Sequence, residues 1–333
     1  MKGAYAPLLA TAVLVCGCSA NTFKDTISNF DTGVGSVQQT AQLYTTEFES
    51  TAVKLSVQSA AANKAAVTYD RQNCRIISTT PPAGSPPSTK CALGDSSGKF
   101  LPDTSNDAKL FADLAVLKTY SANLLAIVNA TTVDDLNKAE SSLVTGLKSV
   151  GTDLRPPPKP GVKAPTTGPI FATEVAEIGP LLQPIVDEYI EHLRIEILRD
   201  AVDQADPLIQ QYAASVQFLL GALQQRLIGT KVQYVDNEVR NYNIIANVSV
   251  PANVVAQSTL ENARQENEDV RTLIQPDGNL SASVAKMAAA HAALKKDLDN
   301  PNSGVDLSSK SVYAFAAQAT AALTSAIQLE LKK

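Results

Sequence analysis

Residues 22–50 read TFKDTISNFDTGVGSVQQTAQLYTTEFES, and the spacing of their apolar side chains decides the fold. The apolar positions alternate in steps of four and three: Phe23, Ile27, Phe30, Val34, Val37, Ala41, Tyr44 and Phe48. This 3.5-residue repeat predicts one apolar stripe on a long helix that supercoils against a partner helix. Continued less regularly, the pattern predicts a helix from Thr22 to Arg71, roughly 75 Å long. Gly33 and Gly35 are two positions where we expect this helix to bend.

The rest of the chain carries further helical patterns separated by turns. We expect helices over residues 110–127, 131–147, 184–198, 207–247, 252–274, 280–298 and 307–331. Asp206-Pro207 predicts the start of a new helix, because Asp is a good N-cap and Pro fits the first helical position. The apolar stripe of that helix includes Val232 and Val239. Because no strand alternation persists, the predicted fold class is all-α, an elongated multi-helix bundle with long coiled-coil-like helices.

A proline-rich segment divides these helices into two groups. Six prolines lie between Arg155 and Pro169, which predicts extended polyproline geometry rather than helix. The segment is either a semi-rigid linker between two units or a strap that crosses one bundle. We therefore expect an N-terminal helical region at 18–150, a Pro-rich linker or strap at 151–170, and a C-terminal helical region at 171–333.

The N-terminus reads as an export signal. Lys2 precedes an apolar stretch that is shorter than the about 20 residues of a membrane-spanning helix. The stretch ends in Val15-Cys16-Gly17-Cys18, which resembles the lipobox of bacterial lipoproteins. The resemblance implies a signal peptide over residues 1–17, cleavage before Cys18 and attachment of lipid to its sulfur. Because Ser19 rather than Asp follows the cysteine, the resemblance also implies anchoring at the periplasmic face of the bacterial outer membrane.

Two cysteines remain in the mature chain. Cys74 and Cys91 form an even pair in an oxidising compartment, which favours a disulfide that closes a loop rich in Pro and Ser. Closing a loop of this size is worth about 3 kcal/mol in the chain-entropy model. The alternative is a metal or redox pair, which would need closer spacing or neighbouring histidines.

Few residues point to chemistry. The net charge is -5 and no run of Lys or Arg is present, so nucleic-acid binding is not expected. His192 shares a helix face with Glu188 and Glu196, a weak candidate for a metal site that is better explained as a solvated charged face. His291 is interpreted as a surface or packing residue. No nucleophile elbow or phosphate-binding loop is present, so we expect no cofactor and no catalytic residue.

These observations favour a lipid-anchored helical scaffold or adaptor that binds a protein partner. Two helices of roughly 60–75 Å exceed the usual globular length and imply a rod with contact surfaces rather than a compact domain with a cleft. Two alternatives stay open, a helical lipoprotein that binds a small molecule or lipid between its helices, and an enzyme.

Overall fold

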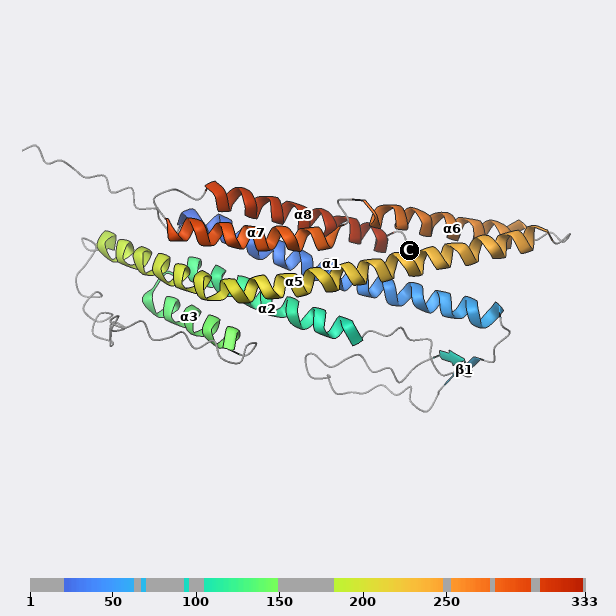
Figure 1. Ribbon diagram of the computed structural model, residues 1–333, viewed down its shortest axis with the longest axis horizontal. Coiled ribbons are helices and arrows are strands. Elements are labelled where there is room, and N and C mark those ends of the chain that lie inside the picture. The colour runs from blue at the N-terminus through green and yellow to red at the C-terminus, as the bar shows by residue number, and fades with distance from the viewer. Residues whose placement is uncertain are drawn as a thin grey trace, which may run out of the picture.

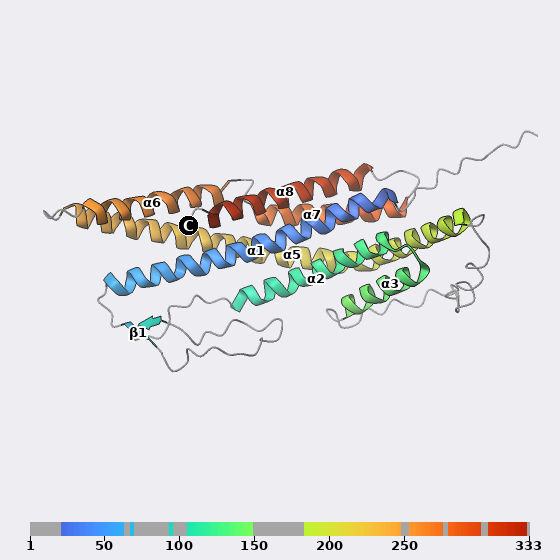
Figure 2. The same ribbon diagram turned by 180° about the vertical axis from the view of Figure 1, so that it is seen from behind.

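A computed structural model describes residues 21–62, 67–69, 93–95, 105–148, 183–247, 253–275, 279–300 and 306–331. Within these ranges the chain forms an elongated bundle whose helices lie close to one common axis (Figures 1 and 2). The helices are α1 (Asn21–Ala62), α2 (Ser105–Asn129), α3 (Val133–Lys148), α5 (Gln183–Ala246), α6 (Asn253–Leu273), α7 (Leu280–Asp299) and α8 (Asp306–Leu331). This architecture confirms the predicted all-α, multi-helix bundle.

Two parts of the bundle differ in the number of helices across them. The first part, here called the body, contains α2, α3, α7 and α8 together with the adjoining portions of α1 and α5. Among the described helices, the C-terminal parts of α1 and α5 and helix α6 continue beyond the end of α8 (Figure 1), and we define residues 47–62, residues 228–246 and α6 as the arm. The body therefore has a thick cross-section and the arm a thin one.

The stripe on α1 forms the centre of the body. Its apolar side chains from Phe23 to Tyr44 are buried, as the sequence predicts, and α1 packs against α8, α2 and α5. α1 continues as a helix through Gly33 and Gly35, the two residues where a bend was expected. Gly33 is instead a point of close approach, because a Cβ there would lie 2.5 Å from Cε1 of Phe315 on α8. The ring of Phe315 also packs on Phe30, with centroids 5.7 Å apart.

Helix α5 spans the body and the arm and caps the ends of three neighbouring helices. The last carbonyls of a helix have no partner within it and need donors from elsewhere. Arg194 donates to the carbonyl of Ala130 after α2, at 2.6 Å. Arg199 donates to Leu298 O at the end of α7, at 2.9 Å, and Gln224 donates to Leu273 O at the end of α6, at 2.7 Å. The 64-residue α5 thus fixes where its neighbours stop.

The predicted helix start at Asp206-Pro207 is wrong, because α5 runs without a break from Gln183 to Ala246 with Pro207 inside it. A proline within a helix removes one hydrogen bond and costs about 3 kcal/mol. Contacts with α7 on the same turns offset this cost. Asp203 pairs with Lys295 at 2.8 Å, and Gln210 donates to the carbonyl of Ala288 at 3.2 Å.

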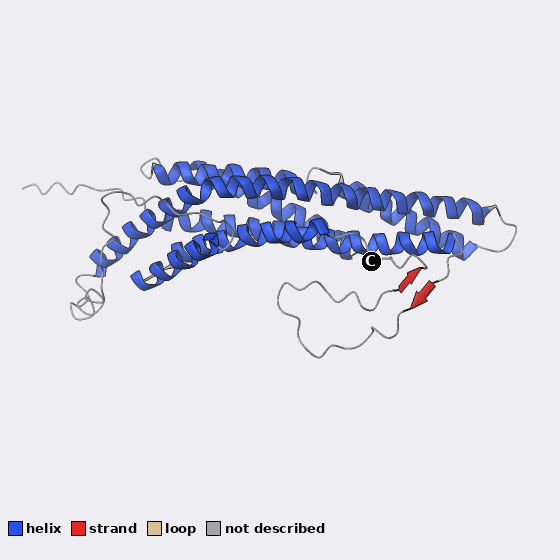
Figure 3. Ribbon diagram, turned by 60° about the horizontal axis from the view of Figure 1, so that its bottom comes forward, coloured by secondary structure: helices blue, strands red, loops and turns tan. Residues whose placement is uncertain are grey.

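The end of α1 also differs from the prediction. The helix stops at Ala62 rather than Arg71, and Val67–Tyr69 forms strand β1. β1 pairs antiparallel with β2 (Leu93–Asp95), the two strands drawn in Figure 3. A β-branched and aromatic run favours a strand over a helix once a pairing partner is near.

The start of α3 lies slightly later than the sequence predicts. The helix begins at Val133 rather than at Thr131. Thr132 is the residue that caps it, because its Oγ1 accepts from the backbone N–H of Asp135 at 3.1 Å.

Helices from both sides of the Pro-rich segment share one apolar core. α1 packs along α8 and α2 packs along α5, so the two predicted helical regions interleave rather than forming two separate bundles. Residues 151–170 themselves lie outside the described ranges. Lys118 and Ser121 of α2 both donate to Oδ1 of Asp31 on α1, at 2.7 and 2.6 Å, which adds a polar link between the first two helices.

A matched pair of glycine substitutions tests the close approach of α1 and α8. Gly33→Ala should lower the free energy of unfolding by about 1–3 kcal/mol, because the new methyl group overlaps the Phe315 ring. Gly35→Ala should raise it by up to about 1 kcal/mol, since Ala is the better helix former and the nearest side-chain atom there lies 3.6 Å away. Urea denaturation of the soluble form lacking residues 1–18 measures both. Equal effects of the two substitutions would contradict this packing.

Candidate functional site

The arm has a polar interior, unlike the body. Along α5, the buried leucines Leu220, Leu223 and Leu227 are followed by buried Lys231, Tyr234 and Glu238. The facing positions on the other two helices are also largely polar and buried: Glu47 and Thr51 on α1, and Thr259, Glu266 and Asp269 on α6. The arm is therefore held by charged and hydrogen-bonded side chains where the body is held by apolar packing.

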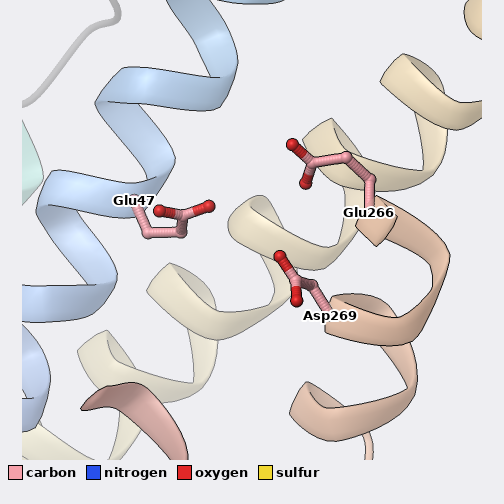
Figure 4. A group of neighbouring side chains, drawn as sticks. All are labelled: Glu47, Glu266 and Asp269. Atoms are coloured by element: carbon pink, nitrogen blue, oxygen red, sulfur yellow. The ribbon is translucent and has the colours of Figure 1, made fainter. Parts of the chain in front are cut away.

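Lys231 is the centre of this polar interior, and its side chain is fully buried. Its ammonium donates to Oε1 of Glu47 on α1 at 2.6 Å. It also donates to Oε2 of Glu266 at 2.5 Å and to Oδ2 of Asp269 at 3.1 Å, both on α6. One lysine of α5 thus ties α1 to α6. Figure 4 shows the three carboxylates pointing toward one another from these two helices.

The charge of Lys231 is stabilised by its neighbours. Burial on its own would lower the pKa of this lysine, but the charges and hydrogen bonds of Glu266 and Glu47 outweigh burial and raise it above 10.5. The side chain is consequently an ammonium ion at neutral pH. Three ion-pair partners satisfy its three N–H donors, which is the arrangement that a buried lysine requires.

The same carboxylates have the composition of a metal site. One oxygen from each of Glu47, Glu266 and Asp269 lies within 4.8 Å of the others, and oxygen ligands of this kind suit Mg²⁺, Ca²⁺ or Mn²⁺. Lys231 already hydrogen-bonds to all three, so a metal ion would have to displace the ammonium from the same atoms. The geometry therefore supports a structural ion cluster rather than a metal centre.

A second layer of polar contacts surrounds this cluster. Lys54 on α1 donates to Oε1 of Glu266 at 2.9 Å, and its ammonium lies 5.7 Å from the ring centroid of Tyr234. Gln58 donates to Glu238, which joins the far end of α1 to α5. Burial and then the charge of Glu238 raise the pKa of Tyr234 to about 12, so its hydroxyl keeps its proton.

An open cavity of about 270 Å³ lies beside the cluster, between α1 and α6. It is bordered by α1, α5 and α6 of the arm and by the last turns of α8. Its lining residues are Glu47, Lys54, Tyr234, Asn262, Gln265, Glu266, Asp269 and Leu329. The cavity thus begins where α8 ends and continues along the arm.

Several large apolar side chains are exposed on the outer surface of the arm, among polar and charged ones. Its exposed large apolar side chains are Val53 and Val57 on α1, Val232, Val239 and Ile244 on α5, and Val254, Val255 and Leu260 on α6. Val232 and Val239 were predicted as part of a buried stripe, and that prediction is wrong. Lys231 and Glu238 occupy the interior positions on this part of α5, and the two valines lie on the outside.

A second buried polar group lies in the body and links three helices. His291 of α7 is fully buried, with Nε2 2.7 Å from Oη of Tyr120 on α2 and Nδ1 2.9 Å from Oδ1 of Asp206 on α5. The carboxylate of Asp206 accepts a hydrogen bond from Nδ1–H of His291, which leaves Nε2 to accept a hydrogen bond from the hydroxyl of Tyr120. Burial lowers the pKa of His291 more than Asp206 raises it, and Lys295 lowers it further.

This Tyr–His–Asp chain resembles a catalytic relay in composition but not in exposure. Tyr120 and His291 are both buried, and the rings of Phe30 and Tyr120 pack against the imidazole at 6.2 and 5.5 Å. A catalytic group must reach its substrate within hydrogen-bonding distance. We therefore interpret the chain as a structural link; of the two roles expected for His291, surface or packing, its burial excludes the first.

The residues singled out from sequence do not gather at either cluster. His192 is exposed on α5 with Nε2 3.5 Å from Glu196, as expected for a solvated charged face. The side chain of Glu188 lies outside the described part of the chain, as do Cys18, Cys74 and Cys91.

The Lys231 cluster was missed by sequence reasoning, although the sequence contains a signal for it. The buried leucines Leu220, Leu223 and Leu227 on α5 follow one another in steps of three and four. The next step of four leads to Lys231, which therefore lies on the same side of the helix as these leucines. A lysine that continues an apolar stripe indicates a buried cation, whose partners the sequence does not name.

Comparisons with known proteins give no assignment. No protein-family model matches the chain, and searches of the curated proteins and of the solved structures return no match. In the described part of the chain, one helix, Asp107–Asn129, is long and apolar enough to cross a membrane by length and composition. Its buried leucines pack against α1 and α5, as those of a core helix in a bundle do.

Removing the central lysine tests the arm's ion cluster. Lys231→Met should lower the free energy of unfolding by about 3–5 kcal/mol, because it leaves buried carboxylates without their cation. Lys54→Met is the matched control and should cost less than about 1 kcal/mol, since this lysine is partly exposed. Hydrogen exchange should localise the loss to α6 and residues 228–246. Similar losses in the two variants would contradict the central role of Lys231.

The buried histidine predicts a pH dependence of stability. The unfolded chain binds a proton near pH 6.5, whereas folded His291 binds it only at lower pH. The free energy of unfolding should therefore fall as the pH drops below about 6.5, by up to about 1.4 kcal/mol per pH unit, until the lower folded pKa is reached. His291→Gln should reduce this slope, and His192→Gln should leave it unchanged. Urea denaturation between pH 5 and pH 8, a window of about 3 units around that value, measures it.

Proposed function

We propose that this protein is a lipid-anchored helical adaptor, fixed to a bacterial outer membrane through Cys18, with the arm as the part that binds a protein partner. The observation that carries the proposal is the arm itself, where charged side chains are buried around Lys231 while several large apolar side chains of α1, α5 and α6 are exposed. Exposed apolar side chains can serve as contacts for a protein partner. The arm also extends away from the body, where a partner can approach it (Figure 1).

The N-terminal end of α1 supports the same geometry. α1 begins at Asn21, only three residues after the cysteine of the lipobox, and its other end lies in the arm. An anchor at Cys18 would therefore attach at the body end of α1 and leave the arm at the far end of a helix of 42 residues, about 63 Å long. This separation would place the arm well away from the membrane surface.

A small-molecule pocket receives less support. The cavity beside the Lys231 cluster is about 270 Å³, which is below the usual 300–1,000 Å³ of ligand pockets, and charged side chains line much of it. An enzyme receives less support again, because Tyr120 and His291 of the Tyr–His–Asp chain are buried. The adaptor is therefore the function that this surface fits best.

A substitution at the lipobox tests the anchor and the adaptor together. Cys18→Ser should abolish fatty-acid labelling and move the chain out of the membrane fraction, and a protein partner should change fraction with it. Cys16→Ser is the matched control, because Cys16 leaves with the signal peptide, and it should change neither. Quantitative mass spectrometry of membrane and soluble fractions measures both. Unchanged fatty-acid labelling of the membrane-bound chain would refute the anchor, and a chain that moves without any partner would refute the adaptor.

A further inference from the structure

The α1 face that packs against α8 in the body continues into the arm beyond Leu331, the last described residue of α8. Leu43 borders a small cavity together with Ala326 and Leu329 of α8, so this side of α1 faces α8. Ser50 and Val57 follow Leu43 at seven-residue steps and therefore lie on the same side of the helix. α8 ends at Leu331, and Val57 is exposed.

Helix α6 forms the other wall of the same space. Asn262 and Gln265 line the cavity of about 270 Å³ that begins at Leu329. Val255 lies seven residues before Asn262, on the same side of α6, and is 57% exposed. α6 packs along α5 but reaches α1 mainly through the ion pairs of Lys54 and Lys231, so the two helices border a groove. Val57, on the α8-facing side of α1, and Val255, on the cavity-facing side of α6, lie further along the arm by helix periodicity.

The charge of this groove selects the kind of occupant. The cluster beside it contains four carboxylates, on Glu47, Glu238, Glu266 and Asp269, and two ammonium groups, on Lys54 and Lys231. Carboxylates thus exceed cations by two within the described residues of this cluster. An occupant with Lys or Arg at this end would complement the excess, whereas an acidic one would be repelled.

We propose that this groove binds an amphipathic helix of a partner protein, which takes up the line of α8 with a basic side chain near the carboxylates and aliphatic side chains against Val57 and Val255. The shape favours a helix, because α8 fills the corresponding space in the body. Helix-in-groove binding of this kind uses apolar anchors spaced at three, four and seven residues. The inference rests on the proposed adaptor function and adds the docking surface and the chemistry of the partner.

Site-specific photocrosslinking of the full-length, membrane-anchored chain tests the groove. A photoreactive phenylalanine derivative at Val57 or at Val255 should crosslink to one partner segment, identified by mass spectrometry as an amphipathic helical sequence with Lys or Arg at one end. Val232 and Val239 are the matched controls, because they are exposed valines on α5 outside the cavity lining. The control positions should give at least about tenfold less crosslinking, because they lie outside the groove.

A charge substitution makes the test specific for a basic helix. Asn262→Lys places a cation in the groove and should reduce crosslinking from Val255 by about tenfold or more, through repulsion of the partner's basic residue. Asn267→Lys, on an exposed position of α6 away from the cavity lining, should leave it unchanged. Circular dichroism melting of both variants verifies that the arm stays folded.

The outcomes separate the groove from the adaptor. Crosslinking of a partner only through Val232 or Val239 would overturn the groove and leave the adaptor intact. Crosslinks from Val57 and Val255 to a second copy of this chain, to lipid, or to an acidic segment would also overturn the proposed occupant. The absence of any crosslinked protein at all four positions would remove the adaptor function together with the groove.

Discussion

The continuity of α5 through Pro207 is the constraint on which the rest of the structure depends. A break there would detach the part of α5 that caps α2 and α7 from the part that caps α6 and carries Lys231. The proline costs about 3 kcal/mol of helix stability. The structure offsets this cost with bonds to α7 on neighbouring turns, from Asp203, Asp206 and Gln210. The hydrogen bond between buried His291 and Asp206 therefore helps to hold the turn of α5 that contains Pro207.

Beyond Leu227 the same helix changes its manner of packing. In the body, burial of leucines and aromatic rings supplies the main stabilising term, at about 25 cal/mol per Å² of apolar surface. In the arm, the interior positions of α5 carry a lysine, a tyrosine and a glutamate, whose burial is tolerated only because each has partners. A buried ion cluster contributes little net stability compared with apolar side chains of similar volume, but here its hydrogen bonds join α1, α5 and α6 at one point. Compared with an apolar interior of similar volume, the ion cluster gives the arm less stability but a more defined arrangement of its three helices.

The sequence predicts the helices well and the contacts between them poorly. Periodicity locates α6, α7 and α8 to within about two residues, a good result for element boundaries. It fails at Pro207 because the bonds that rescue the helix come from α7, which is distant in sequence; Asp206 and His291 are 85 residues apart. It misplaces Val232 and Val239 because an apolar residue is assumed to face the core, whereas here Lys231 and Glu238 do so with partners from α1 and α6. A bend was expected at Gly33 because glycine is a poor helix former. The ring of Phe315 that packs against Gly33 comes from α8, which is distant in sequence, so the local pattern does not reveal it.

The arm combines a largely polar interior with several exposed aliphatic side chains. At the interior positions that Lys231 and Glu238 occupy on α5, ion pairs and hydrogen bonds take the place of apolar packing, and Val232 and Val239 lie outside. An apolar surface on a loosely packed hairpin would adapt to many partners, but the three carboxylates around Lys231 fix the spacing of α1 and α6 and hence the width of the groove. A rigid groove loses less conformational entropy when a helix binds, which favours affinity. In the proposed complex, the ion cluster would hold the walls of the groove in place for the bound helix.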